Sequence, residues 1–202
     1  MWECSTKLRA LAALAMFPLA AHAQPLVEVN APAINCVFAA SCTITVSDTT
    51  GNLLLPTLAP GTAWLQSRTG TTGYEYRLSM TQTSVAADCV TGLALNFGPS
   101  KQLPYKDNAL ADVFVITTGG LGTIGIRSAE RSGDAIVFEF KAPLCADGPP
   151  DIKRTTFFFG LAAAAAPMHV NASVSVIGFP PIYAVDARVP THPVAADPPG
   201  GL

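Results

Sequence analysis

The chain has 202 residues, of which 50% are hydrophobic and 13% are charged, and its formal net charge is −2. This apolar content excludes a disordered, charge-rich protein, because such chains cannot bury enough apolar surface to fold. The pI of about 5.8 argues against nucleic-acid binding, which normally requires clustered Lys and Arg. The length is that of a single domain.

The first 23 residues have the three parts of a secretory signal peptide. Lys7 and Arg9 supply a positive start, residues 11–21 are almost wholly apolar, and Ala21-His22-Ala23 has the small-x-small pattern of a cleavage site. We predict cleavage after Ala23 and a secreted or periplasmic product. The apolar run is shorter than the roughly 20 residues that span a membrane, and no later stretch is apolar enough to cross one, so we expect no membrane span.

Beyond residue 40, alternation of apolar and polar residues predicts short β-strands. Tyr74, Tyr76, Leu78 and Met80 alternate with polar residues, which indicates a strand with one face in the core and one in solvent. Val137 interrupts an otherwise polar face of another strand. The predicted strands are 43–47, 63–67, 74–81, 112–118, 136–140, 156–160 and 170–176.

Segments rich in Gly, Pro, Asn and Asp separate these strands. Residues 161–166 favour a helix, but Pro167 ends the run, so the segment is either one helical turn or part of a strand. We therefore predict an all-β fold, an antiparallel β-sandwich of Ig-like or jelly-roll-like type. One domain is expected over 24–189, followed by a loose Pro- and Gly-rich tail over 190–202.

Four cysteines remain after cleavage, namely Cys36, Cys42, Cys89 and Cys145. An even number in an exported chain indicates disulfides, and three pairings are possible. We favour Cys36–Cys42, which clamps a local loop, and Cys89–Cys145, which closes a long loop worth about 4 kcal/mol in the chain-entropy model. The alternative of metal-binding thiols fits less well, because Cys-x5-Cys is not a usual zinc spacing.

Residues 120–125 match the letters of a dinucleotide fingerprint. That function requires a helix to begin there, whereas the sequence continues into a turn and another strand. The segment is better interpreted as a glycine-rich turn or bulge. Because backbone amides without side chains approach ligands closely, Gly120 and Gly122 are ligand-binding candidates.

Candidates for catalysis and metal binding are sparse. A hydrolase would have to use His169, because His192 lies in the predicted tail and no Gly-x-Ser-x-Gly elbow exists. Met168 and His169 with Met80 are a thin set of copper ligands. The carboxylates available for glycoside chemistry also fit a solvated surface; they are Glu75, Asp107, Asp112, Glu130 and Glu139.

Aromatic side chains offer the best binding candidates. Trp64 is the only tryptophan of the mature chain, and Tyr105 lies in a loop between Lys101 and Lys106. The sequence thus predicts a ligand-binding set of Trp64, Tyr105, Gly120 and Gly122.

The sequence favours an exported binding or surface-interaction module without a cofactor, with a glycan or a protein as its partner. Three alternatives stay open: a secreted hydrolase acting on polysaccharide or ester, a periplasmic metal carrier, and a structural subunit of an extracellular assembly that joins by strand addition.

Overall fold

A computed structural model describes residues 23–26, 28–31, 47–52, 63–69, 73–80, 89–105, 109–117, 122–145, 154–163, 165–177 and 183–193. These residues form strands and no helix, which confirms the all-β prediction. The strands are β1 (Gln24–Pro25), β2 (Glu28–Ala31), β3 (Ser47–Asn52), β4 (Ala63–Thr69), β5 (Gly73–Met80), β6 (Cys89–Asn96), β7 (Leu103–Tyr105), β8 (Ala109–Ala111), β9 (Val113–Ile116), β10 (Ile126–Ser132), β11 (Ala135–Cys145), β12 (Phe158–Ala162), β13 (Pro167–Val176) and β14 (Tyr183–Pro190).

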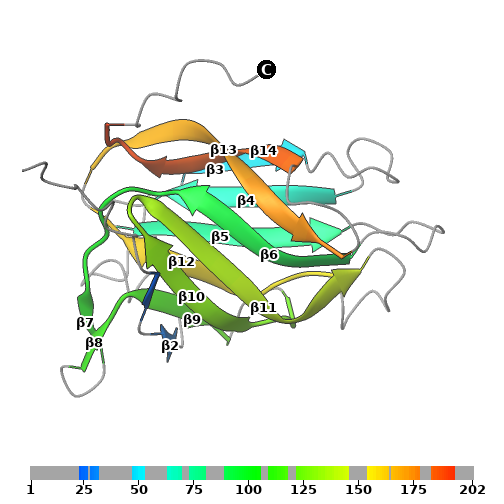
Figure 1. Cartoon of the computed structure of the whole chain (residues 1–202), viewed down its shortest axis with the longest axis horizontal. Coiled ribbons are helices and arrows are strands. Elements are labelled where there is room, and N and C mark those ends of the chain that lie inside the picture. The colour runs from blue at the N-terminus through cyan, green and yellow to red at the C-terminus, as the bar shows by residue number, and fades with distance from the viewer. Residues whose placement is uncertain are drawn as a thin grey trace, which may run out of the picture.

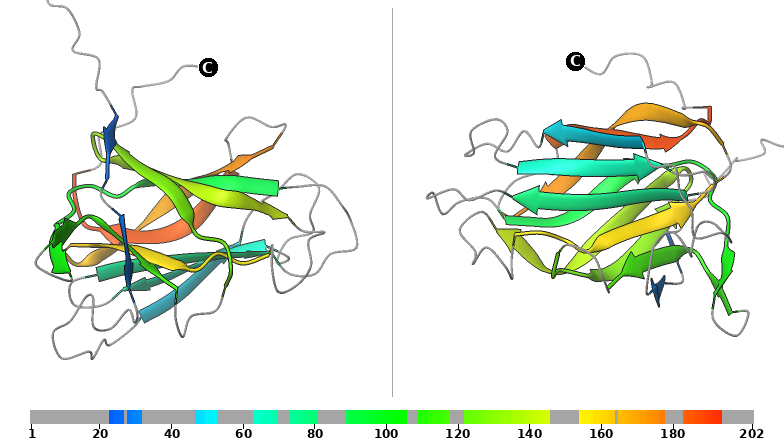
Figure 2. Two further views of the ribbon diagram at one scale, coloured as in Figure 1. Left: turned by 90° about the horizontal axis from the view of Figure 1, so that it is seen from below. Right: turned by 180° about the vertical axis from the view of Figure 1, so that it is seen from behind.

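The strands form two six-stranded sheets and a small ribbon (Figure 1). Sheet A has the order β1-β10-β11-β6-β13-β14, sheet B has the order β2-β9-β12-β5-β4-β3, and β7 pairs with β8. The view from below shows the two sheets one above the other (Figure 2, left). Strand pairing is antiparallel, as predicted, except that β2 runs parallel to β9.

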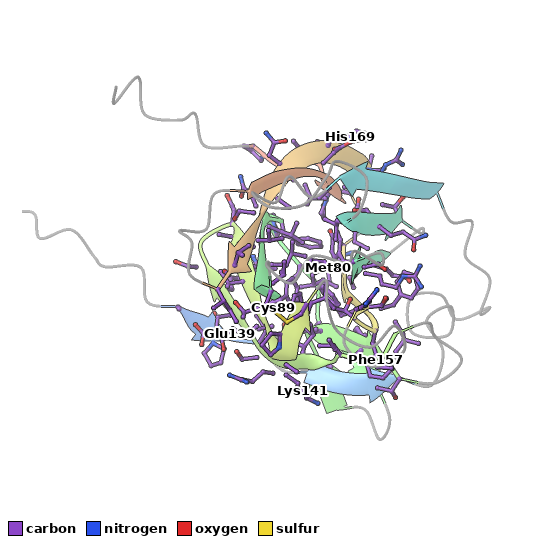
Figure 3. The ribbon with its side chains drawn as sticks, turned by 90° about the vertical axis from the view of Figure 1, so that its right-hand side faces the viewer. Met80, Cys89, Glu139, Lys141, Phe157 and His169 are labelled. Carbon is purple, nitrogen blue, oxygen red and sulfur yellow. A yellow bond between two sulfur atoms is a disulfide. The ribbon has the colours of Figure 1, made fainter. Side chains whose placement is uncertain are left out.

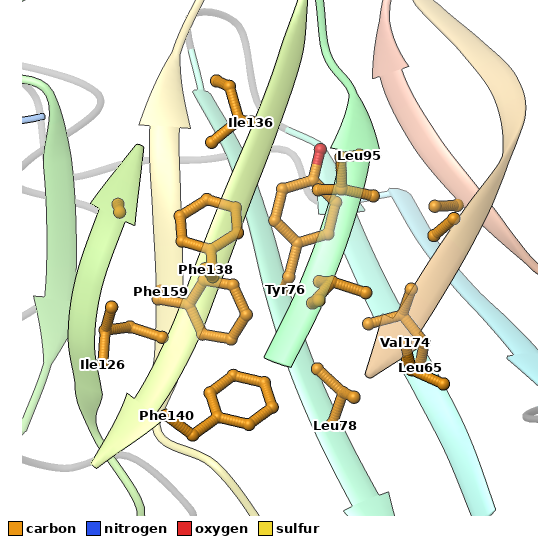
Figure 4. Close-up of a cluster of buried hydrophobic side chains, with 14 of the residues drawn as sticks. Leu65, Tyr76, Leu78, Leu95, Ile126, Ile136, Phe138, Phe140, Phe159 and Val174 are labelled. Atoms are coloured by element: carbon orange, nitrogen blue, oxygen red, sulfur yellow. The ribbon is translucent and has the colours of Figure 1, made fainter. Parts of the chain in front are cut away.

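The two sheets share one hydrophobic core built from alternate residues of their strands. In β11, Ile136, Phe138 and Phe140 are buried while Val137 and Glu139 face solvent, as the alternation predicts. The Phe138 ring lies 4.9 Å from the Phe159 ring of sheet B (Figure 4). Such ring contacts between the sheets stabilise their packing beyond the area that they bury.

The prediction of a half-buried β5 is wrong. Tyr74, Tyr76, Leu78 and Met80 fill the core as expected, but the opposite face of the strand is also buried. Glu75 is only 3% exposed and Arg77 only 8% exposed, and the Arg77 guanidinium lies 4.8 Å from the centre of the Phe158 ring. Alternation shows which face is apolar, but it does not show whether other parts of a protein cover the polar face.

Sheet A closes against sheet B along β14 through side-chain hydroxyls. Tyr76 donates a hydrogen bond of 2.6 Å to the carbonyl of Arg188, and the Arg188 amide donates to Ser67 Oγ at 3.4 Å. Tyr74 likewise donates to the carbonyl of Ala165 at 2.7 Å. These bonds satisfy backbone groups at the margin of the sheet that would otherwise be unpaired.

On the other side, the N-terminal segment joins the edges of both sheets. β1 pairs antiparallel with β10 of sheet A, and β2 pairs parallel with β9 of sheet B. The Leu26 amide donates to the Ala129 carbonyl at 2.8 Å. Because bonded and non-bonded pairs alternate along an antiparallel ladder, Pro25 falls at a non-bonded position, where its missing N–H costs nothing.

The disulfide between Cys89 and Cys145 is present, as predicted, and joins register partners of β6 and β11. Cys36 and Cys42 lie outside the described residues.

Leu161 and Ala162 belong to β12, so this part of the Ala-rich run is a strand. Thr191, assigned by sequence to the loose tail, donates its amide to the carbonyl of Ala166 at 2.7 Å, and His192 is 8% exposed. Thr191 and His192 therefore pack against the rest of the protein.

Candidate binding surface

The outer face of sheet A is open to solvent, in contrast to the buried outer face of β5 in sheet B. Arg127 and Glu130 of β10 and Glu139 and Lys141 of β11 are exposed on it. Val137, at 40% exposure, is the apolar residue that interrupts this polar face. The side-chain view places Glu139 and Lys141 together on one side of the molecule, far from His169 (Figure 3).

A depression of about 330 Å³ lies in this face. Residues of four strands line it, namely Thr91, Gly92, Arg127, Val137, Phe138, Glu139, Phe140, Pro143 and Ser175. Its polar groups therefore come from β6, β10, β11 and β13, which lie side by side in the sheet.

The depression forms where the pairing of the sheet is irregular. The register shifts at Arg127 in the β10–β11 pairing, between Glu139 and Leu144 in the β11–β6 pairing, and at Thr91 in the β6–β13 pairing. The three shifts lie in consecutive pairings of the sheet, at the same end of its strands. Bulges bend strands and re-aim side chains, and they are common beside functional sites.

Two structural features support the irregular region. The Cys89–Cys145 disulfide closes the end of the β6–β11 ladder next to it. Gly92 forms its floor, and an added Cβ there would lie 2.6 Å from the carbonyl oxygen of Phe138. No side chain fits between β6 and β11 at this point, so the backbone itself forms the bottom of the depression.

The hydrogen bonds made by side chains at the depression are few and long. Thr91 Oγ1 donates to the Ser175 carbonyl at 3.3 Å, Ser128 Oγ donates to Glu139 Oε2 at 3.2 Å, and Arg127 Nη2 donates to the Lys141 carbonyl at 3.4 Å. Arg127 and Glu139 are both exposed, and no ion pair joins them. Both charges therefore remain accessible to a ligand.

The structure does not bring the sequence-predicted binding residues together. Trp64 is in β4, opposite Ser79 of β5, and Tyr105 is in β7 of the small ribbon. Gly122 precedes β10, has a φ of +123°, and packs against the backbone of Thr156, where an added Cβ would overlap the carbonyl oxygen. Gly120 lies outside the described residues. Gly122 does not line the depression.

Two signals in the sequence point to the depression. Val137 breaks the polar face of its strand and places an apolar side chain among charged ones. Pro143 lies within a continuous strand, where proline marks a bulge or an edge. Thr91, Gly92, Arg127 and Ser175 carry no signal of their own.

The catalytic and metal candidates form no complete site within the described residues. His169 Nδ1 lies 2.9 Å from Asp186 Oδ1, with both side chains about half exposed, but no described hydroxyl or thiol is bonded to this ring. Met80 is in the core, at 1% exposure. No group of three His, Cys, Asp or Glu side chains in the described ranges has the arrangement of a metal site.

The candidate carboxylates are dispersed. Glu75 is buried in sheet B, Asp112 accepts a hydrogen bond from Gln102 at 3.1 Å, and Glu130 and Glu139 are exposed on sheet A. Asp107 lies outside the described residues. Of these side chains, Glu139 alone lines the depression.

A second polar cluster holds the loop after β6 in place. Arg131 Nη1 donates to the Gly98 carbonyl and Nη2 donates to Ser100 Oγ, each at 2.6 Å. Burial lowers the pKa of the Arg131 guanidinium, and the charges of Asp112 and Asp134 partly offset this effect. Because its donors are used within the protein, we assign Arg131 a structural role.

No protein family, curated protein or solved structure matches this chain. Among the residues that the structure describes, no helix has the length and hydrophobicity of a membrane span. The fold defines the class of this protein as all-β, with a disulfide that joins two neighbouring strands.

Proposed function

We propose that this chain is an exported binding or surface-interaction module that works without a cofactor. In this proposal, residues 1–23 are removed as a signal peptide, and the remaining domain is an antiparallel β-sandwich of Ig-like or jelly-roll-like type. The proposed binding surface is the outer face of sheet A, and the partner is a protein or a glycan.

The depression in the outer face of sheet A carries the proposal. It lies on a solvent-exposed surface, combines the apolar Val137 with the charged Arg127 and Glu139, and is built on three adjacent register shifts. A regular, purely structural sheet needs none of these shifts. The set of Trp64, Tyr105, Gly120 and Gly122 stays a prediction.

The first test is the intact mass of the protein recovered from an exporting host, measured under denaturing conditions. Cleavage after Ala23 predicts a chain that begins at Gln24 and has the mass expected for two disulfides. A chain that keeps residues 1–23 would contradict export by this signal.

The second test screens the exported protein against a glycan array and a panel of extracellular proteins. Two variants then locate the binding surface. Val137→Arg places a bulky charge in the depression, and Leu110→Arg makes the same change on β8, at a residue that is 53% exposed. We expect Val137→Arg to weaken capture at least about tenfold and Leu110→Arg to leave it unchanged. The reverse result would assign binding to the β7–β8 ribbon, which carries Tyr105.

A further inference from the structure

The depression is bordered by two charges of opposite sign that do not pair with each other. Arg127 has one long hydrogen bond, to the Lys141 carbonyl at 3.4 Å, and Glu139 accepts one, from Ser128 at 3.2 Å. A guanidinium has five N–H donors and a carboxylate has about four acceptor positions. Most of this capacity faces solvent, so both groups can form charge-assisted hydrogen bonds with a ligand.

The floor of the depression, on the β6 side of Glu139, suits an extended backbone better than a sugar ring. Gly92 and Ser175 have short side chains, and the buried Phe138 and Phe140 contribute no exposed ring. Sugar recognition usually relies on an exposed aromatic face, and this lining has none. In addition, residues 140–143 of β11 have no register partner in β6.

We propose that the depression binds an extended peptide segment of another protein, one that presents a carboxylate to Arg127 and a basic side chain to Glu139. The inference rests on the proposed function, because it names the partner of the same surface. Arg127 and Glu139 lie at nearly the same level of neighbouring strands, so the two charges orient a peptide that crosses the strands, and Val137, two residues before Glu139 in β11, supplies an apolar contact beside them.

The experiment uses nitrogen-15 NMR spectra of the exported protein and short blocked peptides as probes. One series carries Asp and Lys separated by one to three glycines, and a matched series carries Asn and Gln at the same positions. We expect the charged series to produce saturable shifts in the amide signals of Thr91, Gly92 and Val137, and the neutral series to bind about tenfold more weakly.

Matched variants test the role of each charge. Arg127→Gln and Glu139→Gln should each weaken binding of the charged series by about tenfold. Lys101→Gln, an exposed cation that does not line the depression, should have no effect. Both residues under test are exposed, so the fold is expected to survive, and the unchanged spectrum of each free variant checks this directly.

Three results would overturn the inference: equal binding of the neutral series, binding that is insensitive to both variants, or shifts confined to another surface. Displacement of the peptide by a glycan from the array, with no protein partner found, would make the depression a glycan site instead. If neither the array nor the protein panel yields any ligand, the proposed function itself fails, and the intact mass shows separately whether export holds.

Discussion

The backbone conformation and the close packing of Gly122 explain why glycine occupies this position, which the sequence marks as a ligand-binding candidate. The amides of the neighbouring Thr123 and Ile124 donate to the carbonyl of Thr155, at 3.0 and 3.2 Å. The segment before β10 is thereby held against residues 155–156, and Gly122 lies at the closest approach with a φ of +123°. Only glycine adopts this conformation readily and also lacks the Cβ that would overlap the Thr156 carbonyl.

We predict that Gly122→Ala lowers the free energy of unfolding by about 3 kcal/mol, because it combines an unfavourable φ with a backbone overlap. The control is Gly133→Ala, which has a φ of +59° but meets nothing within 4 Å, and it should cost only about 1 kcal/mol. Urea unfolding followed by circular dichroism measures both. Equal losses would contradict the packing argument. A fully stable Gly122→Ala protein with weakened ligand capture would restore Gly122 as a binding residue.

At the scale of strands, the sequence predicts faces well and irregular pairing poorly. The alternation of β11 and β13 identifies Phe138 and Val174 as core residues, and both are fully buried. The same pattern places Glu75 in solvent, which is wrong, because burial of the second face depends on parts of the chain remote in sequence. The depression depends on where three registers shift, and only Pro143 marks such a place locally.

The cross-strand disulfide was predictable because cysteine spacing and loop length carry a physical preference. Cys89 and Cys145 are 56 residues apart, so their bond removes many conformations of the unfolded chain. They are also register partners, so the disulfide fixes the end of the β6–β11 ladder beside the depression.

We predict that Cys89→Ala with Cys145→Ala lowers the free energy of unfolding by about 4 kcal/mol. The matched control is Cys36→Ala with Cys42→Ala, which opens only a short loop and should cost about 2 kcal/mol if that predicted disulfide forms. Urea titrations of both double variants without reductant give the comparison. The order of the two losses is the critical result, since a larger loss for the Cys36 and Cys42 pair would contradict the loop-length argument.

For the whole molecule, the two sides of the paired sheets close by different means. The N-terminal segment joins β10 and β9 through backbone pairing, whereas β14 is fixed to sheet B through the hydroxyls of Tyr76 and Ser67. The hydroxyl contacts depend on protonation, because a tyrosinate cannot donate to a carbonyl. The contact between β14 and sheet B therefore depends on pH.

Burial raises the pKa of Tyr74 to about 12 and raises that of Tyr76 well above its ordinary value of 10.0, with the neighbouring Tyr74 adding to the second shift. In the unfolded chain both phenols lose their protons near pH 10. Between these values the folded state binds more protons than the unfolded state, so the free energy of unfolding falls as pH rises. Stability from these groups is complete below about pH 10 and is lost progressively toward pH 12 and above.

We predict that urea unfolding curves show this loss of stability in the wild-type protein and a smaller loss in Tyr74→Phe and Tyr76→Phe. Each variant should be about 1 kcal/mol less stable at pH 8, because the carbonyl of Ala165 or of Arg188 loses its hydrogen bond from the phenol. Each should also depend less on pH above 10, because one titrating phenol is gone. Parallel pH profiles for all three proteins would show that these hydroxyls do not govern the alkaline limit of the fold.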